Sequence, residues 1–148
     1  DVYKSQLGTA GSAATTTVAA ANGNHDGTPT NAQVFTATGL NLAYSGAPTA
    51  FDLFVDAGTA VGNGVQVRVS YDLTGNGSWD RTETWRYFAT DPVSGYEHYT
   101  QAAGLASATG TFGALSNGTV RVEVWSAIGS NPSTVGIGNQ SVLRLPYS

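Results

Sequence analysis

Apolar and polar residues alternate along two segments of the chain, as they do in strands that bury one face. Between residues 65 and 72 one set of alternate positions is apolar (Val65, Val67, Val69 and Tyr71) and the other is polar. Between residues 119 and 125 three valines alternate with Arg121, Glu123 and Trp125. Successive side chains of a strand point to opposite faces, and β-branched residues favour strands. Both segments are therefore predicted to be strands with their valines toward a core.

Seven further segments have strand-like composition, and clusters of Gly, Asn, Asp, Ser and Pro separate them. The predicted strands cover residues 2–6, 15–20, 33–38, 51–56, 65–73, 79–88, 96–101, 120–127 and 141–145. No convincing helix interrupts them. Many short strands at this spacing predict an all-β fold, an antiparallel β-sandwich of jelly-roll or Ig-like type, in a single domain spanning residues 1–148.

A second pattern sets large aromatic residues beside charged ones. The segment 79–87 reads Trp-x-Arg-x-Glu-x-Trp-x-Tyr, and residues 121–125 repeat the order Arg-x-Glu-x-Trp. The valine alternation puts Arg121, Glu123 and Trp125 on the outer face. If both segments belong to one sheet, we expect Arg81, Glu83 and Trp85 to share that face. Such a surface suits a flat, hydroxyl-rich ligand, and the alternative is a lattice of cross-strand ion pairs capped by aromatic rings.

Composition narrows the class of ligand. Charged residues make up 11% of the chain, against roughly 25% in average soluble proteins. A net charge of −4 with only six basic residues argues against nucleic acid and against an anionic membrane surface. The chain has no cysteine, so thiolate chemistry is excluded. A neutral ligand is expected, and the Thr/Ser/Gly/Asn-rich composition resembles that of secreted bacterial modules.

Metal binding and catalysis find little support. Residues 72–83 read D-x-T-G-N-G-x-W-D-x-x-E, which matches several positions of an EF-hand calcium loop. EF-hand loops lie between helices, whereas this one lies between predicted strands, so a type I′ hairpin is the favoured interpretation and neither calcium nor a cofactor is expected. Glu83 and Glu123 each have arginine neighbours, which disfavours the protonated form that a glycosidase acid needs. We expect no enzymatic activity.

Three stretches resemble carbohydrate-binding modules of family 56. They read Tyr-Asp-Leu-Thr-Gly-Asn-Gly-Ser-Trp-Asp-Arg-Thr-Glu-Thr at 71–84, Phe-Ala-Thr-Asp-Pro at 88–92 and Val-Glu-Val-Trp-Ser-Ala-Ile-Gly at 122–129. The resemblance implies a secreted β-sandwich, attached to a microbial β-1,3-glucanase, that binds β-1,3-glucan such as laminarin or curdlan. An extracellular monomer that targets an attached glycoside hydrolase to insoluble substrate is the resulting expectation. The alternative is a structural or adhesive sandwich of a secreted or cell-surface protein.

The residues expected to bind carbohydrate follow from physical reasoning alone. Partly exposed tryptophans would stack on sugar rings, and nearby polar groups would bond to the hydroxyls. The set comprises Trp79, Trp85, Trp125, Arg81, Glu83 and the loop residues His25 and Asp26. Trp79 is the first choice, because it lies where the hairpin turn meets the strand.

Overall fold

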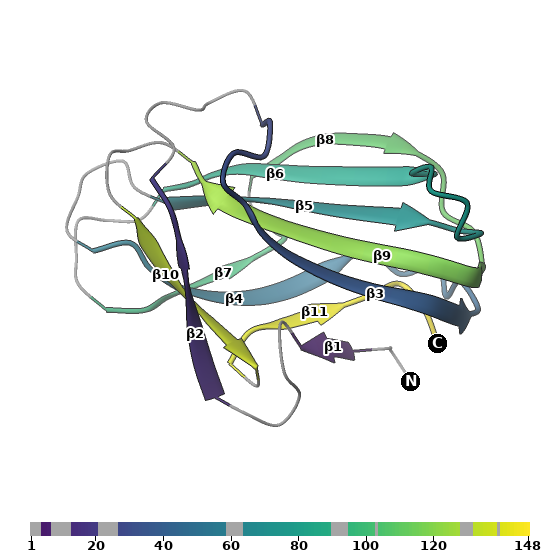
Figure 1. Ribbon diagram of the computed structural model, residues 1–148, viewed down its shortest axis with the longest axis horizontal. Coiled ribbons are helices and arrows are strands. Elements are labelled where there is room, and N and C mark those ends of the chain that lie inside the picture. Colours follow the sequence, from purple (N-terminus) through teal and green to yellow (C-terminus); the bar gives the residue numbers. More distant parts are fainter. Residues whose placement is uncertain are drawn as a thin grey trace.

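Two antiparallel sheets packed face to face make up the computed structural model (Figure 1). It describes residues 4–6, 13–20, 27–58, 64–89, 95–102, 104–127, 132–138 and 140–148. The strands are β1 (Lys4–Gln6), β2 (Ala13–Val18), β3 (Gln33–Leu42), β4 (Ala50–Asp56), β5 (Gly64–Asp72), β6 (Arg81–Ala89), β7 (Glu97–Thr100), β8 (Leu105–Gly110), β9 (Leu115–Ser126), β10 (Ser133–Gly138) and β11 (Val142–Arg144). No helix occurs among the described residues, so none there could cross a membrane. The predicted all-β sandwich is confirmed.

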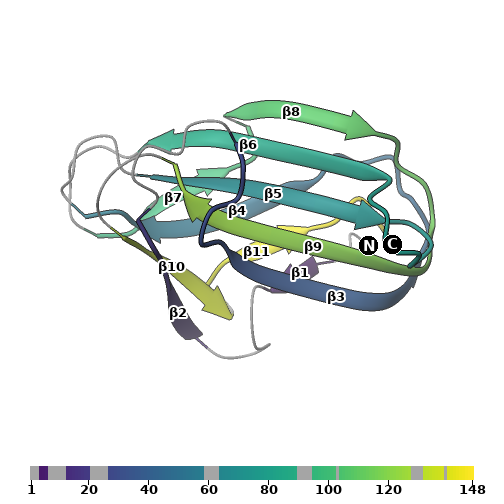
Figure 2. The same ribbon diagram turned by 45° about the horizontal axis from the view of Figure 1, so that its top comes forward.

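The five-stranded sheet has the order β3-β9-β5-β6-β8, and its strands fan out side by side in Figure 2. In the other sheet β4 is central. It pairs with β7 on one side, while β10 and β11 pair with successive parts of β4 and continue to β2 and β1. Each of the nine predicted strands is present, with ends shifted by a few residues. The strands β8 and β10 were not predicted, because their sequences Leu-Ala-Ser-Ala-Thr-Gly and Ser-Thr-Val-Gly-Ile-Gly are rich in small residues that favour strands weakly.

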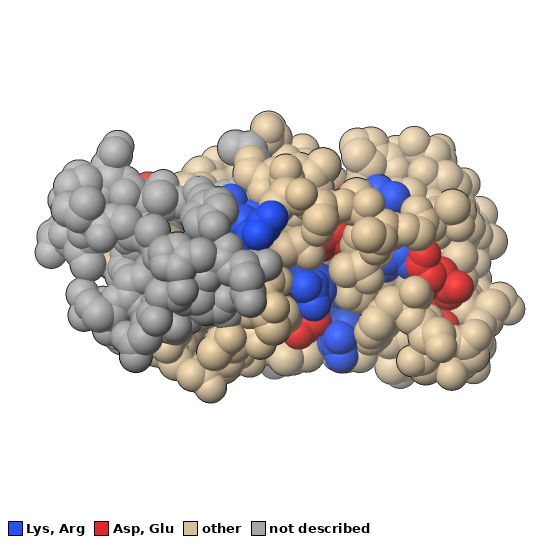
Figure 3. Space-filling view, turned by 90° about the horizontal axis from the view of Figure 1, so that it is seen from above, with Lys and Arg blue, Asp and Glu red and all other residues tan. Residues whose placement is uncertain are grey.

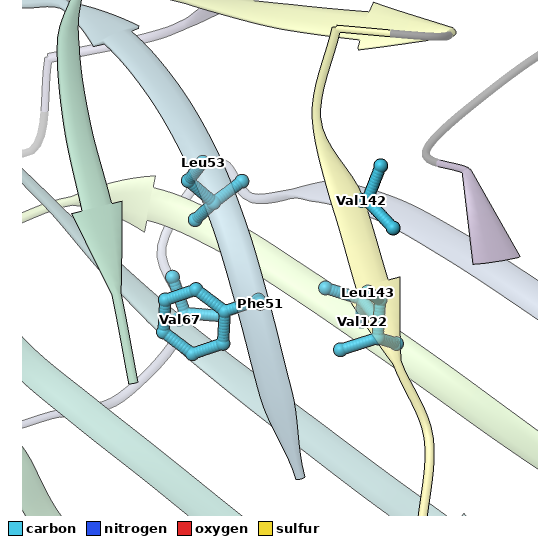
Figure 4. A pocket seen from close by; sticks show the side chains of 6 residues that line it. All are labelled: Phe51, Leu53, Val67, Val122, Val142 and Leu143. Carbon is cyan, nitrogen blue, oxygen red and sulfur yellow. The ribbon is translucent and has the colours of Figure 1, made fainter. Parts of the chain in front are cut away.

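The core lies between the sheets, and the valine alternation faces it as predicted. Val65, Val67 and Val69 are at most 1% exposed, and Val120, Val122 and Val124 at most 5%. Opposite them stand Phe51 and Leu53 of β4 and Leu143 of β11 (Figure 4). Phe51, Leu53 and Leu143 line a cavity together with Val67, Val122 and Val142. It holds only about 10 Å³, no more than a single water needs, and its lining is apolar. The two sheets are therefore closely packed at this point.

The connection between β5 and β6 is an eight-residue loop, residues 73–80, longer than the type I′ hairpin turn predicted between strands 65–73 and 79–88. The Asp72 carboxylate holds this loop by accepting hydrogen bonds from the backbone N–H groups of Thr74, Asn76 and Gly77, at 3.2, 3.2 and 2.7 Å. Burial alone would raise the pKa of Asp72, but these amides outweigh it and lower the pKa below its ordinary value. The carboxylate thus organises the loop.

Asp80 closes the same loop. Its Oδ2 accepts a hydrogen bond from the Leu73 N–H at 2.7 Å, and its own N–H donates to the Tyr71 carbonyl at 2.8 Å. Asp72 and Asp80, the two aspartates of the EF-hand-like pattern, therefore accept hydrogen bonds from backbone N–H groups of the loop. In the part of the chain that the structure describes, no group of three acidic or histidine side chains could hold a metal ion.

The Asn-Gly pair at 117–118 is a dipeptide typical of turns and precedes the predicted strand 120–127, but it lies within β9. Asn117 has a φ of 54°, and the pairing of β9 with β3 shifts register around Gly118. This irregularity lets one long strand continue from Leu115 where the sequence predicted a strand start at residue 120.

Candidate functional site

The two Arg-x-Glu-x-Trp motifs lie on opposite faces of the same sheet. Glu83 of β6 is directly opposite Val69, a core residue, and directly opposite residues of antiparallel strands share a face. Glu123 of β9 is instead opposite Arg68, which points away from the core. The prediction that Arg81 and Glu83 join the outer face is therefore wrong. The loop 73–80 sets the register between β5 and β6, which directs Arg81, Glu83 and Trp85 of β6 inward.

Glu83 forms part of a buried polar chain between the sheets. It is 6% exposed and accepts a hydrogen bond from the Thr49 hydroxyl at 2.6 Å. Since the single Thr49 proton is donated there, the Tyr71 hydroxyl, 2.6 Å from Thr49 Oγ1, donates in turn to Thr49. Burial raises the pKa of Tyr71 far above its ordinary value, which keeps it a donor. This chain links the two sheets, which is a structural role and not a ligand contact.

Arg81 supports the same cluster at the sheet rim. Its Nη2 lies 3.4 Å from Glu83 Oε2, its Nη1 donates to the Gly110 carbonyl at 3.0 Å, and its guanidinium lies 4.6 Å from the centroid of the Phe112 ring. The side chain of Arg81 is 20% exposed. With both Nη groups directed at these partners and its Nε buried, Arg81 braces β6 against β8 and serves poorly as a ligand contact.

Trp85 is a core residue, contrary to the expectation of partial exposure. It is 2% exposed and meets the Phe51 ring of the other sheet edge-on, with centroids 5.1 Å apart. Its indole N–H donates to the Gln101 carbonyl at 3.2 Å. Trp85 therefore presents no ring face to a ligand.

Trp125 lies on the outer face but is fully buried, so the expectation of exposure is wrong for it too. The Arg68 guanidinium lies 5.9 Å from its ring centroid and donates to the Gly27 carbonyl at 2.9 Å. A Cβ on Gly27 would come within 3.0 Å of the Arg86 side chain. The segment that begins at Gly27 thus lies on this end of the outer face, and the predicted loop residues His25 and Asp26 fall outside the described residues.

Trp79 is the predicted tryptophan that remains accessible. It is 39% exposed at the end of the loop 73–80. Arg121 lies 4.5 Å from the centroid of its ring and 3.2 Å from Glu123 Oε1. We call Trp79, Arg121 and Glu123 the Trp79 platform. Figure 3 looks onto this face of the molecule, where basic and acidic side chains are interspersed among neutral ones.

The opposite sheet carries an aromatic groove that is absent from the predicted binding residues. Phe54 of β4 and His98 of β7 are cross-strand neighbours with stacked rings, centroids 4.7 Å apart and planes at 6°. Phe54, Tyr96 and Gln140 line an open cavity of about 300 Å³. Phe54 lies in the alternating segment 52–56, Tyr96 and His98 lie in the alternating segment 96–100, and Gln140 follows β10. Nothing in the sequence indicates that these three parts of the chain would meet.

A charged row borders this groove. The Asp52 carboxylate accepts a hydrogen bond from His98 Nε2 at 2.7 Å and pairs with the Arg144 guanidinium. Burial alone would raise the pKa of Asp52, but His98 and Arg144 outweigh it and lower the pKa. The ring of His98 is thereby held in its stacked position.

The carboxylates on the five-stranded sheet do not form an acid pair. Glu83 is turned into the sandwich and Glu123 away from it, so they cannot face each other across a cleft as glycosidase carboxylates do. The Trp79 platform, an exposed indole with polar neighbours, is instead suited to binding a ligand.

Comparison of the chain with known protein families, curated proteins and solved structures gave no match.

Proposed function

We propose that this chain is a non-catalytic carbohydrate-binding module for a neutral polysaccharide, with β-1,3-glucan the foremost candidate. In this proposal it is secreted and keeps an attached glycoside hydrolase on insoluble substrate. The observation that carries the proposal is the exposed indole of Trp79, held by Arg121 on the outer face of the five-stranded sheet. The resemblance of residues 71–84 to family 56 modules supports β-1,3-glucan within this class.

An indole suits a sugar because both partners present flat apolar faces. The C–H groups of a pyranose pack on the ring, while neighbouring polar groups bond to the hydroxyls around its rim. By analogy with bases stacked on aromatic side chains, one such stack contributes on the order of 1–3 kcal/mol. Arg121, fixed by Glu123 at 3.2 Å, holds the indole in place, so little side-chain freedom is lost on binding.

The charge of the molecule also favours a neutral ligand. Only six basic residues are present, and Arg81, Arg121 and Arg144 are engaged with carboxylates. Binding should therefore depend little on ionic strength, unlike binding to a polyanion.

A pull-down with insoluble curdlan, cellulose, chitin and starch tests the proposal. Wild type should be retained on curdlan, and Trp79→Ala should weaken retention about tenfold to a hundredfold. Val34→Ala is a matched control, because Val34 is 53% exposed and lies on the same face, opposite Glu123, but offers no ring. Retention on none of the four glycans would refute the proposal and favour the structural or adhesive alternative.

A further inference from the structure

The aromatic groove on the β4–β7 sheet has the features of a second ring-binding site. Phe54 and Tyr96 line it, and Tyr96 is 47% exposed. The cavity of about 300 Å³ lies at the lower end of the range usual for small-molecule sites and has room for a sugar ring. None of the described residues that line it is charged.

The local sequence keeps one side of Phe54 open. His98 stacks on one face of the Phe54 ring, so only the remaining side can take a ligand. There β10 pairs Val135 with Val55 and then continues with Gly136, whose lack of a side chain leaves room for Gln140. A Cβ on Gly136 would come within 2.6 Å of the Gln140 Oε1, so the glycine lets the Gln140 amide lie over β10 at the groove.

The polar groups around the groove suit hydroxyls better than ions. Asp52 is already ion-paired with Arg144 and hydrogen-bonded to His98. Among the described lining residues, the Gln140 amide offers both donor and acceptor capacity. Aromatic rings with one amide, and no free charge, match an uncharged hydroxylated ring.

We propose that this groove binds a hexopyranose unit of the same neutral glycan that the Trp79 platform takes. The inference rests on the proposed function and extends it. The two sites lie on the outer faces of different sheets, so a single chain segment cannot cover both at once. The module is then bivalent and bridges two glycan chains, which would strengthen its retention on an insoluble, multi-chain substrate.

A sandwich assay measures bridging directly. The protein is loaded on laminarin-coated beads and washed, and capture of fluorescent laminarin from solution is then recorded. Wild type should capture the second glucan. Tyr96→Ala should remain on the beads through the Trp79 platform but lose at least tenfold in capture of the fluorescent glucan. Trp79→Ala should be held on the beads more weakly, through the groove alone, and should also lose capture.

Two further variants control for folding and for chemistry. Tyr96→Phe keeps the ring and should capture at close to the wild-type level. Gln140→Ala removes the amide without touching either ring and should reduce capture. Unchanged thermal unfolding of each variant shows that the sandwich is intact.

The outcomes separate the two proposals. If wild type binds the beads but Tyr96→Ala captures the second glucan equally well, the groove is not a site and the Trp79 platform stands alone. If wild type binds the beads and captures nothing, bivalency is refuted. If wild type fails to bind the beads, the β-1,3-glucan proposal itself fails, and this inference with it.

Discussion

Replacement of Trp85 by alanine should destabilise the fold and reveal a core residue. Trp85 is 2% exposed, packs edge-on against Phe51 of the other sheet and donates its indole N–H to the Gln101 carbonyl. Truncation of a buried Phe or Trp to alanine costs about 3–5 kcal/mol, since the transfer free energy is lost and a cavity remains. The unpaired Gln101 carbonyl adds to this cost if water does not reach it.

The expected loss is a large part of the total stability. A domain of this kind is stable by about 5–15 kcal/mol, and at this chain length 1 kcal/mol shifts Tm by roughly 2–4 °C. Trp85→Ala should therefore lower Tm by about 6–20 °C. Trp79→Ala removes a partly exposed ring and a cation–π contact worth about 0.5–1 kcal/mol, so it should lower Tm by only a few degrees.

Thermal and urea unfolding, followed by far-UV circular dichroism, would measure both variants. Trp85→Phe is the matched control, because it keeps an aromatic ring against Phe51 and loses the N–H donor and one of the two fused rings. It should recover most of the loss. A Trp85→Ala variant within 1 kcal/mol of wild type, or one no less stable than Trp79→Ala, would refute the placement of Trp85 between the sheets.

Three further predictions concern the loop and the buried polar groups. Gly75 and Gly77 have φ values of 67° and 88°, but only at Gly75 would a Cβ collide with backbone, that of Asn117. Gly75→Ala should therefore destabilise the fold clearly more than Gly77→Ala, for which the left-handed backbone alone costs about 1–2 kcal/mol. Equal losses of stability in urea unfolding would contradict this. The lowered pKa of Asp72 contributes stability that is present above its unfolded-state pKa near 3.8 and is lost as pH falls through the lower folded-state pKa. Asp72→Asn should therefore lower the stability at pH 7 and reduce the further loss of stability in acid. A pH dependence of stability equal to that of wild type would contradict the role of Asp72 in holding the loop 73–80. Burial raises the pKa of Tyr147 from 10.0 to about 12, so the stability of the fold should fall as pH rises across that interval. The fall should be smaller in Tyr147→Phe. Unfolding measured at several alkaline pH values would test this.

Local alternation was sufficient to predict the sandwich and its core. The valines at 65, 67 and 69 and at 120, 122 and 124 bury the same faces that the sequence indicates, because three β-branched apolar residues at period two have only one favourable side. Low charge and frequent turn residues indicated an all-β class independently of any pairing. The buried faces of these strands and the all-β class depend on residues close together in the chain, so the sequence by itself determined them.

The face of β6 could not be determined in this way. Neither of its alternate sets is a plain apolar face, since one carries Arg81, Glu83 and Trp85 and the other carries Thr82 and Thr84. Its direction was decided by pairing with β5, and the loop held by Asp72 and Asp80 sets that register. Two similar motifs in one sheet consequently point to opposite sides.

Only the tertiary structure decided which aromatic residues face solvent. Trp125 points outward from its strand yet is buried, whereas Phe54 and Tyr96 meet Gln140 at a groove assembled from three separate parts of the chain. Alternation assigns a side chain to one side of its own strand. Whether that side is covered, and what lies beside it, depends on strand order and on distant segments, because exposure belongs to the packed surface and not to the strand.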